Sequence, residues 1–132
     1  MGYSLARKTG KDRQAYTGYL RSGAWAWRRQ RWFRDCRRAG TEPACQVCQQ
    51  TLTAAGSLDL HHTSYAGVHI NPDGTFKASE PHADLLPYCR DHHKALHRIL
   101  DDRRSDYWGW DRRRATTVIT AILARKHRKR TS

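Results

Sequence analysis

The chain has 132 residues and a formal net charge of +13, from 25 lysines and arginines against 12 aspartates and glutamates. This length fits one domain with tails, and no apolar run approaches the length of a membrane span. The first twenty residues are polar and basic, without the apolar core of a secretory signal, so we expect a cytoplasmic, intracellular protein. In that compartment the four cysteines favour metal binding over disulfides.

The basic charge is concentrated at the two ends of the chain. Residues 1–44 and 98–132 each carry eleven lysines and arginines, against three and four acidic residues, whereas residues 45–97 carry three against five. Basic arms around a slightly acidic centre suit a polyanionic partner. Double-stranded DNA is the expected partner and RNA an alternative. A basic surface that only keeps the chain soluble is the simpler explanation, which this charge disfavours.

The N-terminal part predicts a tail and one helix. Residues 1–15 are expected to be a basic tail, and 16–44 a lead-in segment that is helical from Tyr16 to about residue 38. Within it Trp25, Trp32 and Cys36 recur at helical spacing, which predicts a buried stripe with arginines between its members.

The remaining elements are short strands followed by two helices, so the expected class is α+β. Strands are predicted at 58–60, 68–70 and around Phe76, with a tight turn over 71–74 and a loop over 79–87. Helical spacing returns over 90–101. Residues 103–132 predict a C-terminal helix, from Asp111 as N-cap to about Lys126, and a basic tail over 125–130.

Two pairs of ligand residues repeat one spacing and predict a closed metal site. Cys45 and Cys48 lie in one turn, and Cys89 and His92 repeat the i, i+3 spacing about forty residues later. Tetrahedral Zn²⁺ takes four such ligands from two turns. The alternative is that His92 is an ordinary surface histidine and no zinc binds. Cys36 is left over, and we expect it to be a small buried apolar residue.

The same helix predicts a second, open site. His93 and His97 are four residues apart and project from one helix face, whereas His92 lies about 100° around the axis from His93. His61, at the end of a strand, is the expected third ligand, which leaves positions for water and substrate. Its neighbour His62 then points elsewhere and suits a general base. The alternative is four ordinary surface histidines.

At these residues the chain resembles the HNH endonuclease family, whose fold is the ββα-metal finger. The similar residues are Cys45-x-x-Cys48, His61-His62 and Asp84-Leu85-x-x-x-Cys89-x-x-His92-His93-x-x-x-His97. Tyr19-Leu20-Arg21-Ser22 followed by Trp25 is also similar to the lead-in helix of small HNH proteins. The resemblance implies a finger with a zinc knuckle over 45–102, flanked by the N- and C-terminal helices, in a bacterial or phage-encoded protein.

The family implies a role for each position. His62 matches the general base, and His61, His93 and His97 match ligands of a catalytic metal, while the Cys45 to His92 set matches the zinc knuckle. Asp84 stands where the family has an Asn that orients the base, and His92 stands where the fourth knuckle ligand is usually Cys. Both residues depart from the family pattern. Because an aspartate replaces the Asn, the pattern leaves open whether Asp84 contacts the metal.

The expected reaction is hydrolysis of a DNA phosphodiester bond. A divalent ion, Mg²⁺, Mn²⁺, Ni²⁺, Co²⁺ or Zn²⁺, would stabilise charge on the phosphate while neutral His62 takes a proton from the attacking water. Imidazole ligands favour binding of the transition metals over Mg²⁺. Basic side chains of the flanking helices are expected to contact the backbone of the nucleic acid: Arg28, Arg31, Arg34, Arg38, Arg112, Arg113, Arg114, Lys126 and Arg128.

The sequence allows alternatives for the tryptophans and for the function. For Trp25 and Trp32 we prefer core packing, and base stacking by Trp108 and Trp110 is a minority interpretation. For the chain as a whole, the alternatives to an enzyme are a non-catalytic zinc module that binds nucleic acid, and a nuclease subunit of a larger phage or defence complex.

Overall fold

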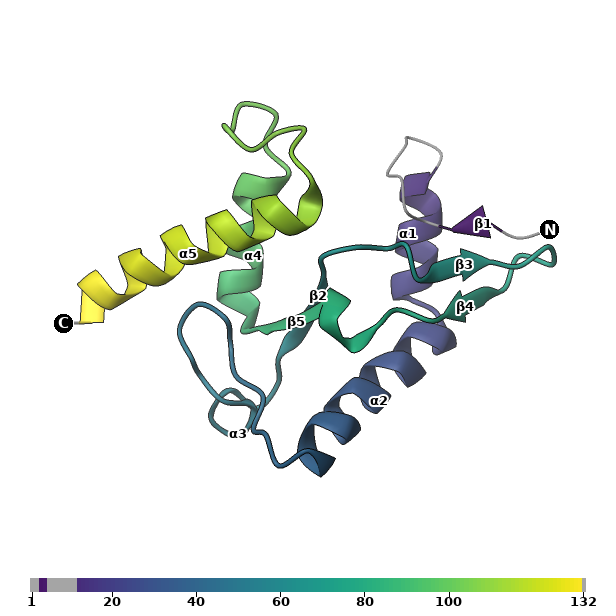
Figure 1. Cartoon of the computed structure of the whole chain (residues 1–132), viewed down its shortest axis with the longest axis horizontal. Helices are drawn as coiled ribbons and strands as arrows, with labels where there is room; N and C mark the ends of the chain where they lie inside the picture. The colour runs from purple at the N-terminus through teal and green to yellow at the C-terminus, as the bar shows by residue number, and fades with distance from the viewer. Residues whose placement is uncertain (1–2, 5–11, 132) are drawn as a thin grey trace. The chain divides into compact units, whose positions relative to one another are not determined.

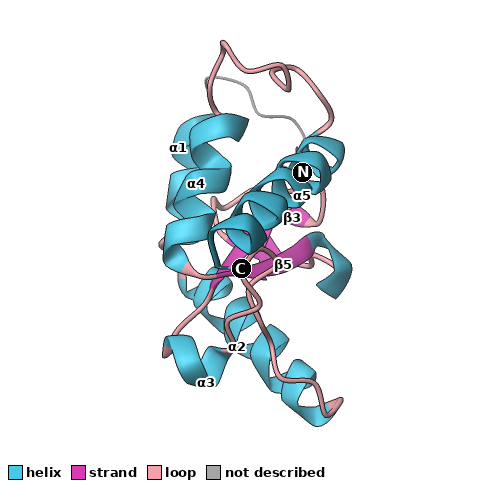
Figure 2. Cartoon of the chain, turned by 90° about the vertical axis from the view of Figure 1, so that its left-hand side faces the viewer, coloured by secondary structure: helices cyan, strands magenta, loops and turns pink. Residues whose placement is uncertain are grey.

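A computed structural model describes the chain except for residues 1–2, 5–11 and 132. The protein is α+β, as predicted, and Figure 2 shows that helices and loops make up most of the described chain. The described strands form two small sheets, one of order β1-β3-β4 and one of order β2-β5. The predicted tail over 1–15 lies largely outside the described residues.

The chain divides into two compact units, and each unit is built from two segments. The first contains residues 1–41 and 64–85, and the second contains residues 42–63 and 86–132. Residues 64–85 lie inside the range 45–102 for which one finger was expected, but they belong to the same unit as the N-terminal helices.

Two helices open the first unit where one was predicted. Helix α1 (Asp12–Leu20) and helix α2 (Gly23–Arg38) are separated by Ser22, whose backbone is extended with φ −81° and ψ 157°. The Ser22 hydroxyl accepts a hydrogen bond from the backbone N–H of Trp25 at 3.2 Å and caps α2. The prediction of one continuous helix is wrong here, because a serine can satisfy an N-terminal N–H group and start a new helix.

A small antiparallel sheet completes the first unit. It contains β1 (Tyr3–Ser4), β3 (Val68–Ile70) and β4 (Phe76–Ala78), and Val68 lies opposite Ala78 in the register. The turn between β3 and β4 has Gly74 at φ 85°, a conformation that glycine adopts at little cost. Both strands and the turn were predicted from the sequence.

Arg28 lies in the core of the first unit and not on its surface. Its side chain is 1% exposed, and its Nε and Nη2 atoms donate to the Glu80 carbonyl oxygen at 3.1 and 2.6 Å. Glu80 also accepts a hydrogen bond of 2.7 Å from the Tyr19 hydroxyl. The prediction that Arg28 contacts nucleic acid is therefore wrong, because a buried guanidinium cannot reach a phosphate. Trp25 is buried as expected, whereas Trp32 is only half-buried.

The second unit holds the ligand residues. Its elements are α3 (Leu52–Ala55), β2 (Asp59–His62), most of β5 (Leu85–Tyr88), α4 (Arg90–Leu100) and α5 (Arg112–Thr131). The short 3-10 helix η1 (His82–Asp84) and strand β5 occupy residues for which only a loop was expected. Pro87 misled that prediction, since proline is rare inside sheets but is tolerated at their edges.

Helices α4 and α5 pack against each other in the second unit, and Figures 1 and 2 show that they cross. Asp111 caps α5 as predicted, because its side chain accepts a hydrogen bond of 3.1 Å from the N–H of Arg114. Leu96, Ala115 and Ile119 are fully buried. The basic residues over 125–130, which were expected to form a tail, belong instead to the last turns of α5.

Candidate metal centres

One helix carries residues of two separate ligand groups. Within the described chain, Cys45, Cys48, Cys89 and His92 form one group, and His61, His93 and His97 form another. In each group the ligand atoms all lie within 4.8 Å of one another. His92 and His93 are successive residues on α4 and belong to different groups.

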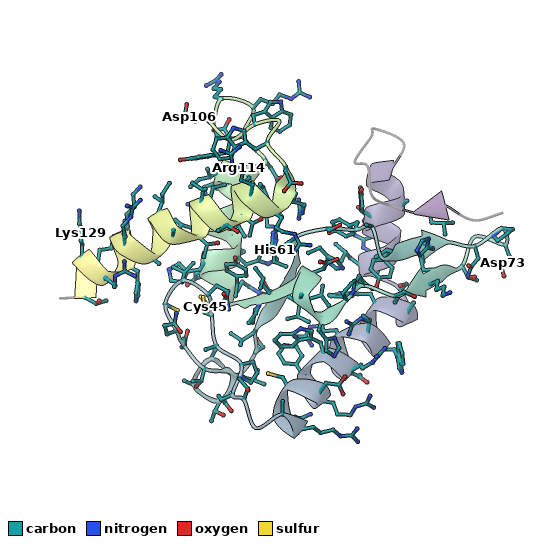
Figure 3. All side chains as sticks on the ribbon, viewed as in Figure 1. Cys45, His61, Asp73, Asp106, Arg114 and Lys129 are labelled. Carbon is teal, nitrogen blue, oxygen red and sulfur yellow. The ribbon has the colours of Figure 1, made fainter. Side chains whose placement is uncertain are left out.

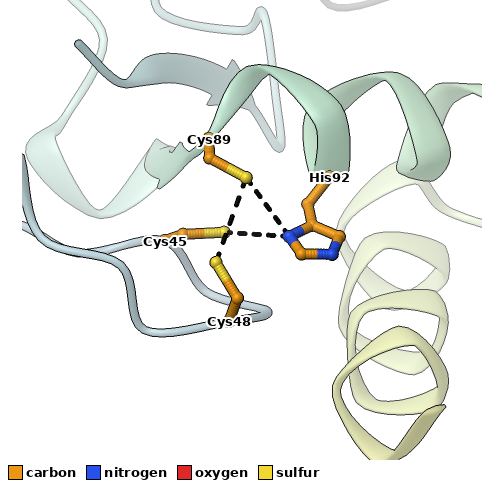
Figure 4. Close-up of side chains that lie close together, drawn as sticks. All are labelled: Cys45, Cys48, Cys89 and His92. Atoms are coloured by element: carbon orange, nitrogen blue, oxygen red, sulfur yellow. Dashed lines mark hydrogen bonds between the residues drawn. The ribbon is translucent and has the colours of Figure 1, made fainter. Parts of the chain in front are cut away.

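The first group has the spacing of a tetrahedral metal site (Figure 4). Cys45 Sγ and Cys89 Sγ lie 3.8 and 3.2 Å from Nδ1 of His92, and the sulfurs of Cys48 and Cys89 are 4.0 Å apart. Two sulfurs bound to one tetrahedral ion at about 2.3 Å would lie about 3.8 Å apart. Three thiols and one imidazole are also a donor set that zinc prefers. The residues therefore fit a metal ion of this kind.

Local backbone geometry positions these four ligands. The N–H of Val47 points to Cys45 Sγ at 3.4 Å, and the N–H of Gln49 donates to the Cys45 carbonyl oxygen at 3.0 Å. Gln49 adopts a positive φ of 64°, which closes the turn around the two cysteines. Cys89 is the N-cap residue of α4, so His92 follows in the first helical turn on the same side.

The thiols influence one another's protonation. Burial raises the pKa of Cys45, but backbone N–H groups of Cys48, Cys89 and Val47 outweigh burial and hold that pKa below its ordinary value. Burial, together with charge on the neighbouring thiols, raises the pKa of Cys89 to about 12. Several thiolates can share this space only if a cation compensates their charge. Burial lowers the pKa of His92, which keeps the imidazole neutral and able to ligate.

The second group combines strand β2 with helix α4. His61 lies on β2, and His93 and His97 lie one turn apart on α4. Their side chains come together over Tyr88, whose ring is stacked on that of His93 with centroids 5.9 Å apart. The Nε2 atoms of His93 and His97 are only 3.1 Å apart.

Two carboxylates fix the tautomers of the α4 histidines. Asp59 Oδ2 lies 3.1 Å from Nδ1 of His93, and Asp101 Oδ2 lies 2.9 Å from Nδ1 of His97. A carboxylate accepts, so each Nδ1 carries the proton and each Nε2 presents a lone pair. Two lone pairs at 3.1 Å repel unless a cation or a proton lies between them. Two nitrogens on one tetrahedral metal would be about 3.3 Å apart.

His61 completes the group with a buried nitrogen atom. Its side chain is 1% exposed, and its Nε2 lies 3.0 Å from the hydroxyl of Thr116 on α5. Among the described residues, its buried Nδ1 has no hydrogen-bond partner. Burial, and to a lesser extent the Arg112 cation, hold the pKa of His61 well below its ordinary range. A neutral, buried nitrogen of this kind fits a metal ligand.

The three residues that contact these histidines were not predicted from the sequence: Asp59, Asp101 and Thr116. Asp101 could have been found, because it follows His97 at i+4 on one helix face. Asp59 could also have been found, because it lies two residues before His61 on the same face of β2. Thr116 belongs to a helix beyond the motif, and nothing in its local sequence indicates the contact.

His62 lies outside the group of three, as expected from the alternation of side chains along a strand. It is 2% exposed, and its carbonyl oxygen accepts a hydrogen bond of 2.6 Å from Nε of Arg112. Asp84 is buried at the end of η1, in the first unit. Their roles as base and as positioning residue stay predictions.

Most of the basic residues predicted to bind a polyanion are exposed. On α2, Arg31 and Arg34 are partly engaged by Asp35, with N–O separations of 3.7 and 3.6 Å. Arg112 is half-buried because it contacts the carbonyl of His62. The exposed members are Arg31, Arg34, Arg38, Arg113, Arg114, Lys126 and Arg128.

None of the described helices is both long enough and apolar enough to cross a membrane. Comparison with protein-family models, with curated proteins and with solved structures finds no match to this chain, so the resemblance to HNH endonucleases depends on its own residues.

Proposed function

We propose that the protein is a metal-dependent endonuclease of the HNH type that hydrolyses phosphodiester bonds in DNA. One observation carries the proposal: the two Nε2 atoms of His93 and His97 face each other at 3.1 Å, beside His61, while carboxylates occupy both Nδ1 atoms. Three imidazoles leave coordination positions open, which is typical of a catalytic site and not of a structural one.

The arrangement of elements supports the same proposal. Strands β2 and β5 form one sheet although β3, β4 and η1 lie between them in the sequence, and α4 follows β5 directly; two paired strands and a following helix are what a ββα-metal finger requires. Cys45, Cys48, Cys89 and His92 would hold a structural zinc ion beside it. That ion joins the cysteine turn to the start of α4 and so fixes the helix that presents His93 and His97.

The residues of this chain would share the reaction as follows. A divalent ion held by His61, His93 and His97 would supply positive charge that stabilises the transition state. His62 would accept the proton as a water oxygen attacks phosphorus, and the bond from phosphorus to the 3′ oxygen would break, with the leaving oxygen taking a proton from solvent water to become the 3′ hydroxyl. Arg112 holds the backbone carbonyl of His62 at 2.6 Å and so orients the strand that carries the base.

Cleavage of plasmid DNA tests the proposal. The purified, zinc-loaded chain is incubated with supercoiled, linear and single-stranded DNA across Mg²⁺, Mn²⁺, Co²⁺, Ni²⁺ and Zn²⁺. We expect metal-dependent cleavage by the parent and by the control His69→Ala, since His69 lies on β3 in the other unit. His62→Ala should reduce the rate by roughly 10²-fold or more. Cleavage by His62→Ala at the parental rate would show that the base is misassigned.

A non-catalytic zinc module that binds nucleic acid is the second candidate. The near-complete burial of His62 favours it, because a general base must reach the attacking water. Metal content separates the two functions. An enzyme should bind one zinc ion tightly and a second ion more weakly, whereas the module should bind only the first. If the parent chain holds one zinc ion, binds no second metal and cuts none of the substrates, the protein is a non-catalytic zinc module and the nuclease proposal fails.

A further inference from the structure

The loop between α4 and α5 begins next to a partner of His97 and ends next to a partner of His62. We call residues 102–111 the aromatic loop. Asp101, immediately before it, accepts from Nδ1 of His97 at 2.9 Å, and Arg112, immediately after it, donates to the carbonyl of His62 at 2.6 Å. The two ends of this loop are therefore fixed beside residues of strand β2 and helix α4.

The aromatic loop is built from consecutive turns. The Ser105 N–H donates to the Asp102 carbonyl at 3.1 Å, the Trp108 N–H to the Ser105 carbonyl at 3.3 Å, and the Trp110 N–H to the Tyr107 carbonyl at 3.1 Å. Figure 3 shows Asp106 on this loop, which projects from the pair of helices, and Arg114 near its base on α5. These hydrogen bonds fix the backbone from which the aromatic rings project.

Two large aromatic side chains of this loop face solvent. Trp108 is 49% exposed and Trp110 is 36% exposed. Tyr107 packs edge-on against Trp110, with ring centroids 5.0 Å apart. Exposed tryptophans cost solvation free energy without adding to the core, so adjacent ones indicate a binding surface.

Arginines lie over both exposed rings. The guanidinium carbon of Arg114 is 4.2 Å from the Trp110 ring centroid, and that of Arg103 is 5.8 Å from the Trp108 ring centroid. Helix α5, which leaves the loop, has eight lysines and arginines and no acidic residue. Aromatic faces interleaved with cations beside a basic helix are what single nucleic-acid strands require: stacking for the bases and positive charge for the phosphates.

We propose that Trp108 and Trp110 stack on unpaired nucleobases of a strand whose backbone extends to the second ligand group, so that the preferred ligand is single-stranded or locally unpaired nucleic acid. This proposal rests on the proposed function for the position of that backbone, but the stacking itself requires no cleavage. Bases paired inside a duplex present only their edges, and a tryptophan face cannot stack on them unless the pair opens.

Binding measurements test the stacking directly. The zinc-loaded full chain is titrated, without added second metal, into fluorescent single-stranded oligonucleotides and into the same sequence as a duplex. We expect the Trp108→Ala/Trp110→Ala double variant to bind the single strand roughly tenfold more weakly than the parent. Its salt dependence should be unchanged, because stacking neutralises no phosphate.

Trp27 provides a matched control. It is 54% exposed and has Arg31 at 5.7 Å from its ring centroid, but it lies on α2 in the other unit. Trp27→Ala should bind as the parent does. Equal losses for Trp27→Ala and the double variant, or no loss for the double variant, would overturn the proposal. So would a response of the loop tryptophans to anionic lipid vesicles and none to oligonucleotides.

A base analogue separates this proposal from the proposed function. 2-Aminopurine changes its fluorescence when it stacks, and we expect a change on binding that disappears in the double variant. If the parent cuts plasmid but shows no such change, the stacking proposal fails and the nuclease stands. If the change occurs but no DNA is cut with any metal, the nuclease fails and the stacking stands.

Discussion

The two ligand groups on α4 differ in what surrounds them. The ligand atoms of Cys45, Cys48, Cys89 and His92 contact mainly one another, so the first group is complete in itself. Each histidine of the second group makes a hydrogen bond to a residue outside the group: His61 to Thr116, His93 to Asp59 and His97 to Asp101. A group that is closed by its own ligands suits a stabilising ion. A group that depends on outside partners can keep a position open for a substrate.

The largest effect should follow from loss of the first group. Cys89→Ser removes a thiolate that joins the cysteine turn to α4, and zinc should be lost with several of the roughly 10 kcal/mol that a structural zinc ion contributes. Metal analysis and thermal unfolding measure the result. Cys36→Ser is the control, since Cys36 belongs to neither group among the described residues and its thiol contacts the Thr41 carbonyl. Full zinc content in Cys89→Ser would contradict the assignment.

His97→Ala should separate the groups from each other. The variant should keep its tight zinc ion and its fold but bind the second metal at least about tenfold more weakly, because one of three ligands is missing. Titration with Co²⁺, followed by its visible absorption, reports the second ion in the zinc-loaded protein. A parallel loss of the first ion would show that the two groups are one site.

Acidification should act through the second group. Burial lowers the pKa values of His61 and His93 below the ordinary value, so the folded protein favours the neutral rings. Their contribution to stability is then complete above about pH 6.5 and declines as the pH falls below it, by up to about 1.4 kcal/mol per pH unit for each histidine. Urea unfolding of the zinc-loaded protein without a second metal measures this slope. A free energy of unfolding that rises between pH 6.5 and 5 would refute it.

The smallest effect should come from Asp101, whose carboxylate is hydrogen-bonded to His97 of the second group. Asp101→Asn replaces an acceptor with an amide, which weakens control of the His97 tautomer, and second-metal affinity should fall about tenfold. Zinc content should not change. Asp106→Asn, in the neighbouring loop, is the control. An affinity for Co²⁺ equal to that of the parent in Asp101→Asn would mean that the hydrogen bond to His97 does not support the metal site.

The ligands could be predicted because their assignment follows from local geometry. His92 and His93 are neighbours on a helix and must face different directions, so one sequence pattern specifies both groups. Arg28 could not be assigned in this way, because it resembles its exposed neighbours and its burial follows from partners far away in the sequence, Glu80 and His82. The role of Thr116 could not be predicted for the same reason, since a contact between residues 55 positions apart leaves no local sequence pattern.

The errors in the fold have related causes. Ser22 interrupts a run of helical spacing with a cap, and Pro87 obscures a strand that is short and at an edge. The assignment of residues 64–85 to the first unit could not be anticipated either. That segment contains a hairpin whose residues are typical of any small sheet, and its partners lie far away in the sequence.

The alternation of the two units along the chain has a consequence for synthesis. Cys48 and Cys89 are 41 residues apart, so the cysteine turn leaves the ribosome well before the rest of its group. Two thiols bind zinc far less tightly than four ligands do. A metal ion would therefore be captured late, after residues 64–85 have emerged and can already pair with the N-terminal helices. Zinc binding would then be a late step of folding, and the first unit could fold before the ligands of the second unit are complete.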